Sequence, residues 1–323
     1  MVDTPGRISL WGIEVFLATS EEGSISGAAR RLGASPSAVS QQLSNLEAAI
    51  GARLLERAAR PVTLTPAGAL FRRRAQTILN EAEQARAELA LEDMSRLTRF
   101  RLGMIEDLDA DVTPALLTGL AQDFGATQFL LETGASHRLF NQLEARALDM
   151  IVAADTGAVA DWMELHPLLE EPFIAAVPRG FLRPDEAVLA QLSRLPVIQY
   201  TSRHHMGRQI ARHLARQDLR LDHRFELDSY HAIMAMVAAG VGWTILTPLG
   251  VLRAHRFRDA AEMIPLPFEP FSRQITLTAR REVLGALPGD VADRLKPLLS
   301  REIIEPCLRQ LPWLAGKLRV LDG

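Results

Sequence analysis

The chain is 323 residues long, which predicts about two domains at ordinary domain sizes. Hydrophobic residues make up 48% and charged residues 23% of it, as is typical of soluble globular proteins. The formal net charge is −3, and a single cysteine, Cys307, excludes an internal disulfide. The N-terminal residues lack the apolar core of a signal peptide, and the longest apolar run, Ala232 to Leu246, is too short to span a bilayer. We therefore expect a cytoplasmic protein.

Residues 24–51 predict two short helices joined by a tight turn, after a first helix from Leu10 to Glu21. Ser24 and Ser35 are suitable N-caps, because a serine hydroxyl accepts a hydrogen bond from an amide of the first turn. Pro36 fits the first position of the second helix, where no amide hydrogen is needed. The pattern is typical of a helix–turn–helix motif, which we place at residues 25–44.

The second of these helices has one apolar face and one polar face without charge. The apolar stripe consists of Val39, Leu43, Leu46 and Ile50, and the opposite face of Ser37, Ser40, Gln41 and Ser44. A freely solvated face usually carries charged residues, whereas small hydroxyls allow close approach to DNA and glutamine can pair with adenine in the major groove. A helix that reads DNA is therefore our interpretation, and a pair of packed helices with a serine-rich surface is the alternative.

The next segment predicts a β-wing made of two short strands, Arg53–Arg57 and Arg60–Thr65. Between Ser24 and Arg74 the chain has eight arginines and two glutamates, a local charge of +6 in a protein of net charge −3. Such a local excess of positive charge favours binding to phosphates. The residues that we expect to contact DNA are Ser26, Arg30, Ser35, Ser37, Ser40, Gln41, Ser44, Arg57 and Arg60.

The stretch EEGSISGAARRLGASPSAVSQQLSNLEAAIGARLLERAARPVTLTPAG strongly resembles the N-terminal domain of the LysR-type transcriptional regulators. The likeness covers the Ala-Ala pair, the Ser-Pro-Ser-Ala-Val-Ser entry to the second helix and the Leu-Thr-Pro-Ala-Gly exit. It implies a winged helix–turn–helix that binds promoter DNA. Many family members have glutamine and then proline after the capping serine, whereas here Pro36 precedes Ser37. Base specificity therefore does not carry over.

A long helix is expected from Pro66 to about residue 92. Its apolar residues alternate at spacings of four and three, the a/d pattern of a coiled coil: Phe71, Ala75, Ile78, Ala82, Ala85 and Leu89. Two such helices would pair and dimerise the protein, and one helix packed on its own domain is the alternative. The resemblance supports pairing, because LysR-type regulators dimerise through a linker helix of this kind. Residues 93–98 would then form a hinge.

The rest of the chain alternates between strands and helices, which predicts doubly wound α/β sheets in two lobes. Expected strands are Arg99–Met104, Gln128–Leu131, Met150–Ala153, Phe173–Pro178, Val197–Tyr200, Arg224–Leu227, Trp243–Leu246 and Gln274–Ala279. Expected helices are Thr113–Phe124, Ser136–Ala147, His205–Arg216 and Ser229–Ala239. The stretches FRLGMI, TGASHRLFNQLEARALDMIVAA and LDSYHAIMAMVAAGVGWTILTPLG resemble, more weakly, a LysR-type effector domain, which implies two lobes like a periplasmic binding protein.

Polar residues follow several of these strands, at the edge where open α/β sheets bind ligands. The effector-binding residues that we expect there are Glu106, Asp107, Thr133, Gly134, Thr201, Ser202, Arg203, Ser229 and Thr247. For Ser229 taken alone, helix capping is the alternative. The loop around Asp107 is acidic and the loop around Arg203 is basic, so a zwitterionic or cationic effector fits, as does a carboxylate held by the second lobe alone. Solvated loop charge is the alternative.

The sequence gives no convincing enzyme motif. The pattern G-x-S-x-G at residues 23–27 follows a helix, although that motif requires a preceding strand. The adjacent His204 and His205 lack the spacing of helical metal ligands. We therefore expect no catalytic residue, no metal and no cofactor.

Together these patterns predict a LysR-type regulator whose partners are double-stranded promoter DNA, a small polar effector and further copies of itself, as a homodimer or homotetramer, with no membrane. A solute-binding-like sensor whose N-terminal domain binds protein is the alternative. The fold expected is α/β with an all-α, winged N-terminal domain. The domains expected are residues 8–65 for DNA binding, 66–92 for dimerisation and 93–323 for the effector, with lobe I at about 99–170 and 270–300, lobe II at about 171–269 and a C-terminal extension at 301–323.

Overall fold

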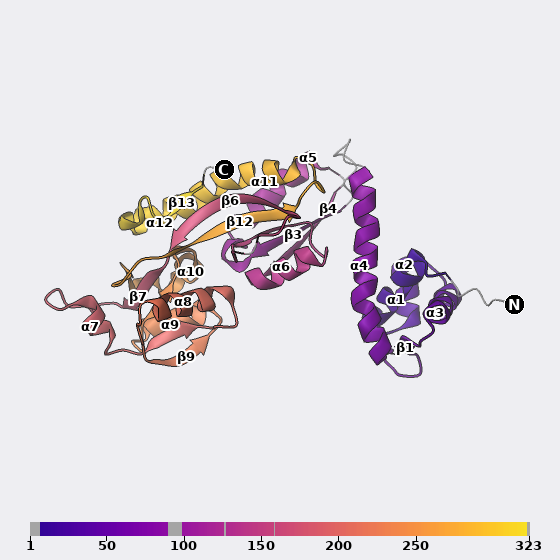
Figure 1. The fold of residues 1–323 in the computed structure, drawn as a ribbon, viewed down its shortest axis with the longest axis horizontal. Coiled ribbons are helices and arrows are strands. Elements are labelled where there is room, and N and C mark those ends of the chain that lie inside the picture. The colour runs from indigo at the N-terminus through magenta and orange to yellow at the C-terminus, as the bar shows by residue number, and fades with distance from the viewer. Residues whose placement is uncertain (1–6, 90–98, 126, 158, 322–323) are drawn as a thin grey trace. The chain divides into compact units, whose positions relative to one another are not determined.

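The computed structural model describes residues 7–89, 99–125, 127–157 and 159–321, and at residues 83, 84 and 86–89 only the backbone. The chain divides into an N-terminal unit that ends at Leu89 and a larger C-terminal unit. Figure 1 shows the helical N-terminal unit in indigo and purple and the α/β unit in magenta to yellow. The expected hinge at 93–98 and the expected helix end at 90–92 lie outside the described residues.

The N-terminal unit is built from α1 (Leu10–Glu22), α2 (Ile25–Leu32), α3 (Pro36–Ile50), β1 (Leu55–Glu56), β2 (Thr63–Leu64) and α4 (Pro66–Leu89). Ser24 Oγ accepts from the Gly27 amide at 3.1 Å and Ser35 Oγ from the Ala38 amide at 3.2 Å, so both predicted caps form. Val39 and Leu43 of α3 are buried against α1, in a core of their own. The wing strands are two residues each, shorter than expected, and are antiparallel.

Lobe I of the C-terminal unit is a six-stranded sheet with the order β13-β6-β12-β5-β3-β4. Its strands are β3 (Arg99–Ile105), β4 (Gln128–Gly134), β5 (Met150–Ala154), β6 (Met163–Pro172), β12 (Ser272–Arg280) and β13 (Arg319–Val320). Its helices are α5 (Thr113–Asp123), α6 (Ser136–Glu144), α11 (Leu287–Leu299) and α12 (Glu305–Gln310), with the short turns η2 (Glu106–Leu108), η4 (Ser300–Ile304) and η5 (Pro312–Leu314). The strands β3, β4 and β5 are parallel, as doubly wound sheets require.

Lobe II holds the sheet β10-β7-β11 and the parallel pair β8-β9, joined by one bridge between Val197 and Trp243. Its strands are β7 (Ile174–Pro178), β8 (Val197–Tyr200), β9 (His223–Leu227), β10 (Thr244–Leu246) and β11 (Ala261–Pro265). Its helices are α7 (Val188–Leu192), α8 (His205–Arg216), α9 (Tyr230–Ala238), α10 (Pro248–Arg253) and the turn η3 (His255–Ala260). The chain crosses between the lobes twice, after β6 and before β12, and these neighbouring strands pair antiparallel.

The C-terminal extension, to which the sequence assigned no role, completes lobe I. Ile303, Cys307 and Leu314 are buried in the lobe's core. The strand β13 covers the edge of β6, and Arg319 donates to Glu170 Oε2 from Nε at 3.0 Å and from Nη2 at 2.7 Å. These hydrogen bonds lower the pKa of Glu170. The tail therefore closes an edge that would otherwise offer unpaired backbone groups to another chain.

None of the helices in the described ranges combines the length and apolarity needed to cross a bilayer.

Candidate nucleic-acid interface and effector cleft

The predicted polar face of α3 is present on the surface. Ser37, Gln41 and Ser44 are exposed and Ser40 is half-buried. Gln41 Nε2 donates to Asn45 Oδ1 at 2.9 Å, and Ser44 Oγ donates to the Ser40 carbonyl at 3.0 Å. Because these bonds stay within one turn of an exposed helix, a base or phosphate can replace them at small cost. Asn45, which the sequence reasoning left out, extends this face by one position.

Ser26 and Arg30 lie on α2, Ser35 caps α3, and all three are exposed. Ser35 Oγ also lies 3.0 Å from Ser37 Oγ, so the cap begins the polar row of α3. Within the described residues Arg30 makes no ion pair, which leaves its guanidinium available for phosphate. Arg31, by contrast, pairs with Glu21 at 2.6 Å, and the hydrogen bond from this pair raises the pKa of Arg31.

The two wing arginines have different surroundings. Arg57 was expected to reach phosphates, but its Nη2 pairs with Glu47 Oε2 at 2.6 Å and its Nη1 donates to Ser44 Oγ at 3.1 Å. Glu47 Oε1 also accepts from the Leu54 amide at 2.7 Å, so Arg57 and Glu47 fasten the wing to α3. Arg60 is exposed and, among the described residues, has no ion pair. Arg60 is therefore the wing arginine that is free to meet phosphate.

The first two residues of the predicted coiled-coil seam face their own domain. Phe71 packs on Phe16 with ring centroids 5.3 Å apart, and Ala75 is fully buried in the same core. The alternative of a helix packed on its own domain is thus correct for this part of α4. Ile78 is 38% exposed and Ala85 is exposed one heptad later, with Ala82 half-buried between them. The side chain of Leu89 lies outside the described residues.

The inter-lobe cleft is nearly filled by the protein's own side chains. Its cavity volume is about 40 Å³, and Glu106, Asp107 and Gly134 from the predicted set line it. The other lining residues are Ile105, Ala135, Ser136, Ala154, Tyr200, His204, His205, Met206, Tyr230 and Arg273. Small-molecule pockets usually hold ~300–1,000 Å³. The cleft in this structure is therefore much smaller than an ordinary small-molecule site.

Arg273, on the crossover strand β12, makes the main polar contacts among the side chains that fill the cleft. Its Nε donates to Glu171 Oε1 at 2.6 Å, and its Nη2 lies 3.4 Å from Asp107 Oδ2. Burial raises the pKa of the fully buried Glu171, opposed by the nearby guanidinium. Burial alone would lower the pKa of Arg273, but the charges around it, Glu171 first, raise it overall. The sequence showed Arg273 only as a charged residue beside an apolar strand. It could not predict the ion pairs, because the partners of Arg273 are distant in the sequence.

Six of the nine predicted effector-binding residues do not line the cleft: Thr133, Thr201, Ser202, Arg203, Ser229 and Thr247. Thr201 Oγ1 donates to Glu226 Oε1 at 2.7 Å, and the Ser202 amide donates to the same oxygen at 2.9 Å. These bonds, that of Thr201 first, lower the pKa of Glu226. The hydroxyls expected to bind an effector are thus used within lobe II.

The remaining residues of that set have local partners as well. Ser229 accepts from an amide of the helix that follows it, so the capping alternative is correct for Ser229. Thr247 caps the next helix in the same way and also accepts from Arg273 Nη2 at 3.3 Å. Arg203 Nε donates to Thr201 Oγ1 at 3.4 Å, and the Thr133 carbonyl accepts from Arg138. A sequence position directly after a predicted strand was therefore not enough to predict which residues line the cavity.

Histidines and tyrosines supply the other polar groups of the cleft. Burial and nearby arginines, Arg208 first, lower the pKa of His205, which favours the neutral imidazole. The Tyr200 hydroxyl lies 3.4 Å from His204 Nδ1, and burial raises the pKa of Tyr200. Asp107 Oδ1 is buried and has no hydrogen-bond partner among the described residues. The cleft therefore offers one unsatisfied carboxylate oxygen.

An ion pair joins the two lobes beside the cleft. Arg253, at the end of α10 in lobe II, pairs with Asp109 Oδ1 at 2.5 Å and donates to the Glu106 carbonyl. Burial works against the charged form of Arg253, but the hydrogen bond to Asp109 raises its pKa overall. Within the described residues, no group of three or more histidine, cysteine, aspartate or glutamate side chains could hold a metal ion.

Comparison with known proteins agrees with both units. Residues 10–69 match the family described as "Bacterial regulatory helix-turn-helix protein, lysR family", and residues 95–295 match "LysR substrate binding domain". The chain is 33% identical over 180 residues to a "Probable hydrogen peroxide-inducible genes activator" of Mycobacterium avium, a match that covers 56% of this chain and 58% of that relative's length.

Two further proteins cover more of the chain. The "DNA-binding transcriptional dual regulator OxyR" of Escherichia coli strain K12 is 26% identical over 255 residues, 78% of this chain and 83% of that protein. A full-length OxyR of Pseudomonas aeruginosa with a cysteine-to-aspartate substitution has a similar fold, with a TM-score of 0.64, 22% identity and coverage of 90% of this chain and 95% of that one.

The chain belongs to the LysR family of bacterial helix–turn–helix transcriptional regulators. The predicted family and the predicted two-part α/β fold are therefore confirmed, and the chain is a regulator rather than an enzyme.

Proposed function

We propose that this chain binds promoter DNA through the outer face of α3 and changes its regulation when a small metabolite enters the inter-lobe cleft. The observation that carries the proposal is the row of exposed, uncharged side chains Ser37, Gln41 and Ser44. Arg30 of α2 and Arg60 of the wing, which have no ion pairs in the described part of the chain, come before and after α3 in the sequence. Hydroxyls and amides can read base edges while unpaired arginines hold phosphates.

In this proposal residues 8–65 bind one half of an interrupted palindrome and residues 66–92 pair two chains. Residues 93–323 respond to the effector, and the working form is a homodimer or homotetramer. Because promoter DNA lies in the bacterial cytoplasm, the proposed location is cytoplasmic. The rival idea, an N-terminal unit that docks to protein instead of DNA, gains no support from a polar face with unpaired arginines beside it.

A thiol switch for peroxide does not fit this chain, although relatives are named for hydrogen peroxide. Thiol oxidation begins at an accessible thiolate. Cys307 is the single cysteine, is buried on α12, and has its pKa raised to about 12 by burial. We therefore propose that the signal is a bound metabolite and not an oxidised cysteine.

The polar groups of the cleft support an effector that carries a cationic donor. Asp107 Oδ1 lacks a partner among the described residues and Glu106 lies beside it, so an ammonium group would satisfy both charge and hydrogen bonding. Arg273 and the imidazole of His205 face the same space and suit a carboxylate on the same molecule. A small zwitterion therefore fits the cleft better than a simple organic acid.

The DNA part is tested by selecting fragments of bacterial genomic DNA with the purified full-length protein. Fragments that share an interrupted palindrome, and that lose binding with Gln41→Ala, support the proposal. Gln42→Ala is the matched control, because Gln42 is the half-buried neighbour of Gln41 on the same helix. Recovery of the same unrelated fragments by all three proteins would remove the assignment of α3 as the reading helix.

The effector part is tested by thermal-shift measurements with amino acids, betaines and organic acids. Asp107→Asn should lower affinity for cationic or zwitterionic hits and should leave affinity for carboxylates equal or higher. Asp111→Asn is the control, since Asp111 is exposed in the same loop and does not line the cleft. Equal losses in both variants would show that loop charge in general, and not a contact at Asp107, attracts the ligand.

A further inference from the structure

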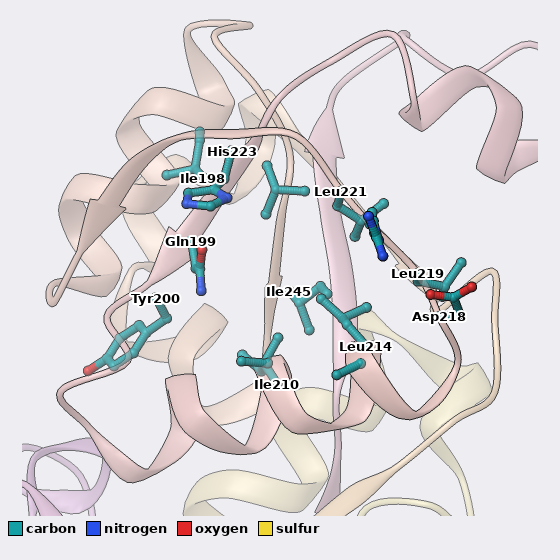
Figure 2. Close-up of a pocket in the computed structure, with 14 residues that line it drawn as sticks. Ile198, Gln199, Tyr200, Ile210, Leu214, Asp218, Leu219, Leu221, His223 and Ile245 are labelled. Carbon is teal, nitrogen blue, oxygen red and sulfur yellow. The ribbon is translucent and has the colours of Figure 1, made fainter.

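A second cavity lies on lobe II and shares one lining residue, Tyr200, with the inter-lobe cleft. It is bounded by α8, by the strands β8 and β9 and by the connection between α8 and β9 (Figure 2). Its volume is about 470 Å³, more than ten times that of the inter-lobe cleft and within the range of small-molecule sites. The space is partly open to solvent, since Ala215, Asp218, Arg220 and His223 among its lining residues are exposed.

The walls of this cavity are mostly aliphatic. They comprise Val197 and Ile198 of β8, Ile210, Ala211, Leu214 and Ala215 of α8, Leu219 and Leu221 of the connection, and Ile245 of β10. Ile198, Ile210 and Ile245 are fully or almost fully buried and form its floor. The two alanines leave room where a larger side chain on α8 would fill the gap against the sheet. Ala211 is half-buried and Ala215 is exposed.

The polar groups at the cavity carry little net charge. Asp218, Arg220 and His223 lie at its exposed side and contribute one anion, one cation and one imidazole. Gln199 is half-buried, and its side-chain amide has no hydrogen-bond partner among the described residues. Figure 2 shows Gln199 across the space from Ile210 and Leu214 of α8. One free amide within an aliphatic enclosure suits a single hydroxyl or amide group on a ligand.

We propose that this cavity is a second ligand site of the protein, for a neutral and mostly apolar small molecule that bears one hydroxyl or amide group. The aliphatic walls hold the apolar body through burial of its surface, and Gln199 orients the polar group. A carboxylate or ammonium ligand is disfavoured, because the walls offer no charged partner deep in the cavity. The site goes beyond the proposed function, since neither DNA binding nor the inter-lobe cleft requires it.

The second site is physically connected to the cleft. Tyr200 lines both spaces, and the first turn of α8, with His205 and Met206, lines the cleft while Ile210 lines the cavity. A ligand that packs against Ile210 therefore biases the position of the same helix that closes the cleft. Coupling of this kind is reciprocal, so an effector in the cleft would change affinity at the second site by the same factor.

The probes for the test are 4-phenylbutan-1-ol and 4-phenylbutyramide, with 4-phenylbutyrate as the charged analogue. Binding to the full-length protein is followed by saturation-transfer NMR and calorimetry. The neutral probes should bind and the carboxylate should bind at least about tenfold more weakly, as expected from leaving a charge without a partner. Ala211→Phe, which places a ring in the cavity, should abolish binding. Ala239→Phe, at an exposed alanine of the same lobe outside both spaces, should leave binding intact.

Gln199→Leu keeps the volume and removes the amide, so it should weaken the neutral probes by about tenfold or less, in keeping with one neutral hydrogen bond. This variant keeps the test decisive even if Ala211→Phe fails to fold. Hydrogen exchange in the first turn of α8 should slow when the wild type binds a probe.

Three results would overturn the proposal. The first is binding of the carboxylate as tight as that of the alcohol. The second is unchanged binding in Ala211→Phe and Gln199→Leu. The third is the absence of probe binding together with a lower oligomeric mass for Ala211→Phe, which would assign the cavity to a side chain of a second copy. Gel shifts with these variants report separately on DNA binding.

Discussion

Polar side chains have different partners on α3 and in the inter-lobe cleft. On α3, Gln41 and Ser44 donate to atoms four residues away on the same exposed helix, and Ser44 also accepts from Arg57 of the wing. In the cleft, Arg273 bonds to groups that lie 26 to 166 residues away in the sequence, and it is buried. Local bonds on an exposed helix exchange readily with water or DNA, whereas long-range bonds between buried charges hold one arrangement of the chain.

The polar groups of α3 are therefore accessible to a binding partner, whereas those of Arg273 in the inter-lobe cleft are already bonded to other side chains of the protein. In the proposed function, the α3 face meets DNA with only the exchange of such local bonds and of the bond from Arg57 to Ser44. Opening the cleft would break the bonds that cross between the lobes, namely Arg273 to Thr247 and Arg253 to Asp109. We infer that the structure represents a closed effector domain, and that effector binding is linked to movement of the two lobes.

The largest effect is expected from Arg273→Met, which leaves Glu171 buried without its cation. Breaking such a pair from one side should lower the free energy of unfolding of the effector domain by about 3–5 kcal/mol. Calorimetric unfolding measures the loss. The double variant Arg273→Met with Glu171→Met should recover much of it, because no unpaired buried charge then remains at that pair. Equal stability of Arg273→Met and wild type would contradict the central role given to Arg273.

The sequence predicted the α3 face well because it needs only local information. Serine caps, a proline at the first helical position and helical periodicity set both the ends of α3 and the side chains it exposes. The same reasoning could not separate Arg57 from Arg60. Whether an arginine pairs with Glu47 depends on how the wing folds back on α3, which periodicity does not contain.

The cleft was predictable only as a region. Strand ends marked Glu106, Asp107 and Gly134, because ligands gather at one edge of a parallel sheet. Thr201 and Ser202 fit the same rule but are bound by Glu226 from the neighbouring strand. Arg273 lies on β12, whose sequence did not mark it as a residue at the end of a parallel strand. The strands β6 and β11 and the helices α10 to α12 also carried no pattern that the sequence analysis used, because buried strands and short helices have no distinctive period.

Ile78→Glu tests the part of α4 that does not pack on its own domain. A carboxylate at this exposed apolar position should disrupt pairing with a second helix and shift the protein towards monomer. Light scattering gives the mass. Gln76→Glu is the control, because Gln76 is exposed nearby on the same helix and lies outside the predicted seam. An unchanged mass for Ile78→Glu would show that α4 serves its own domain alone.

Gln41→Ala probes whether the exposed α3 face reads bases. The change should cost about 1–3 kcal/mol on the specific site and relax preference at one base position. Titrations by fluorescence anisotropy with specific and scrambled DNA measure this. Because Gln41 carries no charge, the dependence of binding on salt should stay the same. A uniform loss on both DNAs would mean that Gln41 supports the helix and does not read sequence.

Arg60→Ala and Arg57→Ala separate the free wing arginine from the bound one. Arg60→Ala should weaken binding to all DNA sequences and reduce the salt slope by about 1, as for one lost phosphate contact. Arg57→Ala should change the slope less, because the Arg57 guanidinium is already paired with Glu47. Its effect should instead appear as faster hydrogen exchange at the amides of Leu54 and Leu55. These amides donate hydrogen bonds to Glu47 Oε1, which Arg57 holds in place. Equal slopes for the two variants would show that Arg57 leaves Glu47 when DNA binds.

The smallest effect concerns the hydroxyls that Glu226 holds away from the cleft. Hydrogen bonds from Thr201 and Ser202 lower the pKa of Glu226 from its ordinary value of 4.5. A carboxylate whose pKa is lower in the folded state stabilises that state fully above its unfolded pKa, and the contribution is lost as the pH falls through the folded pKa. The wild type should therefore exceed Glu226→Gln in thermal stability near pH 7, and the gap should narrow below pH 4.5. A gap that is constant down to strongly acidic pH would mean that these hydroxyls do not favour the ionised carboxylate, and Thr201 and Ser202 would again be available as effector ligands.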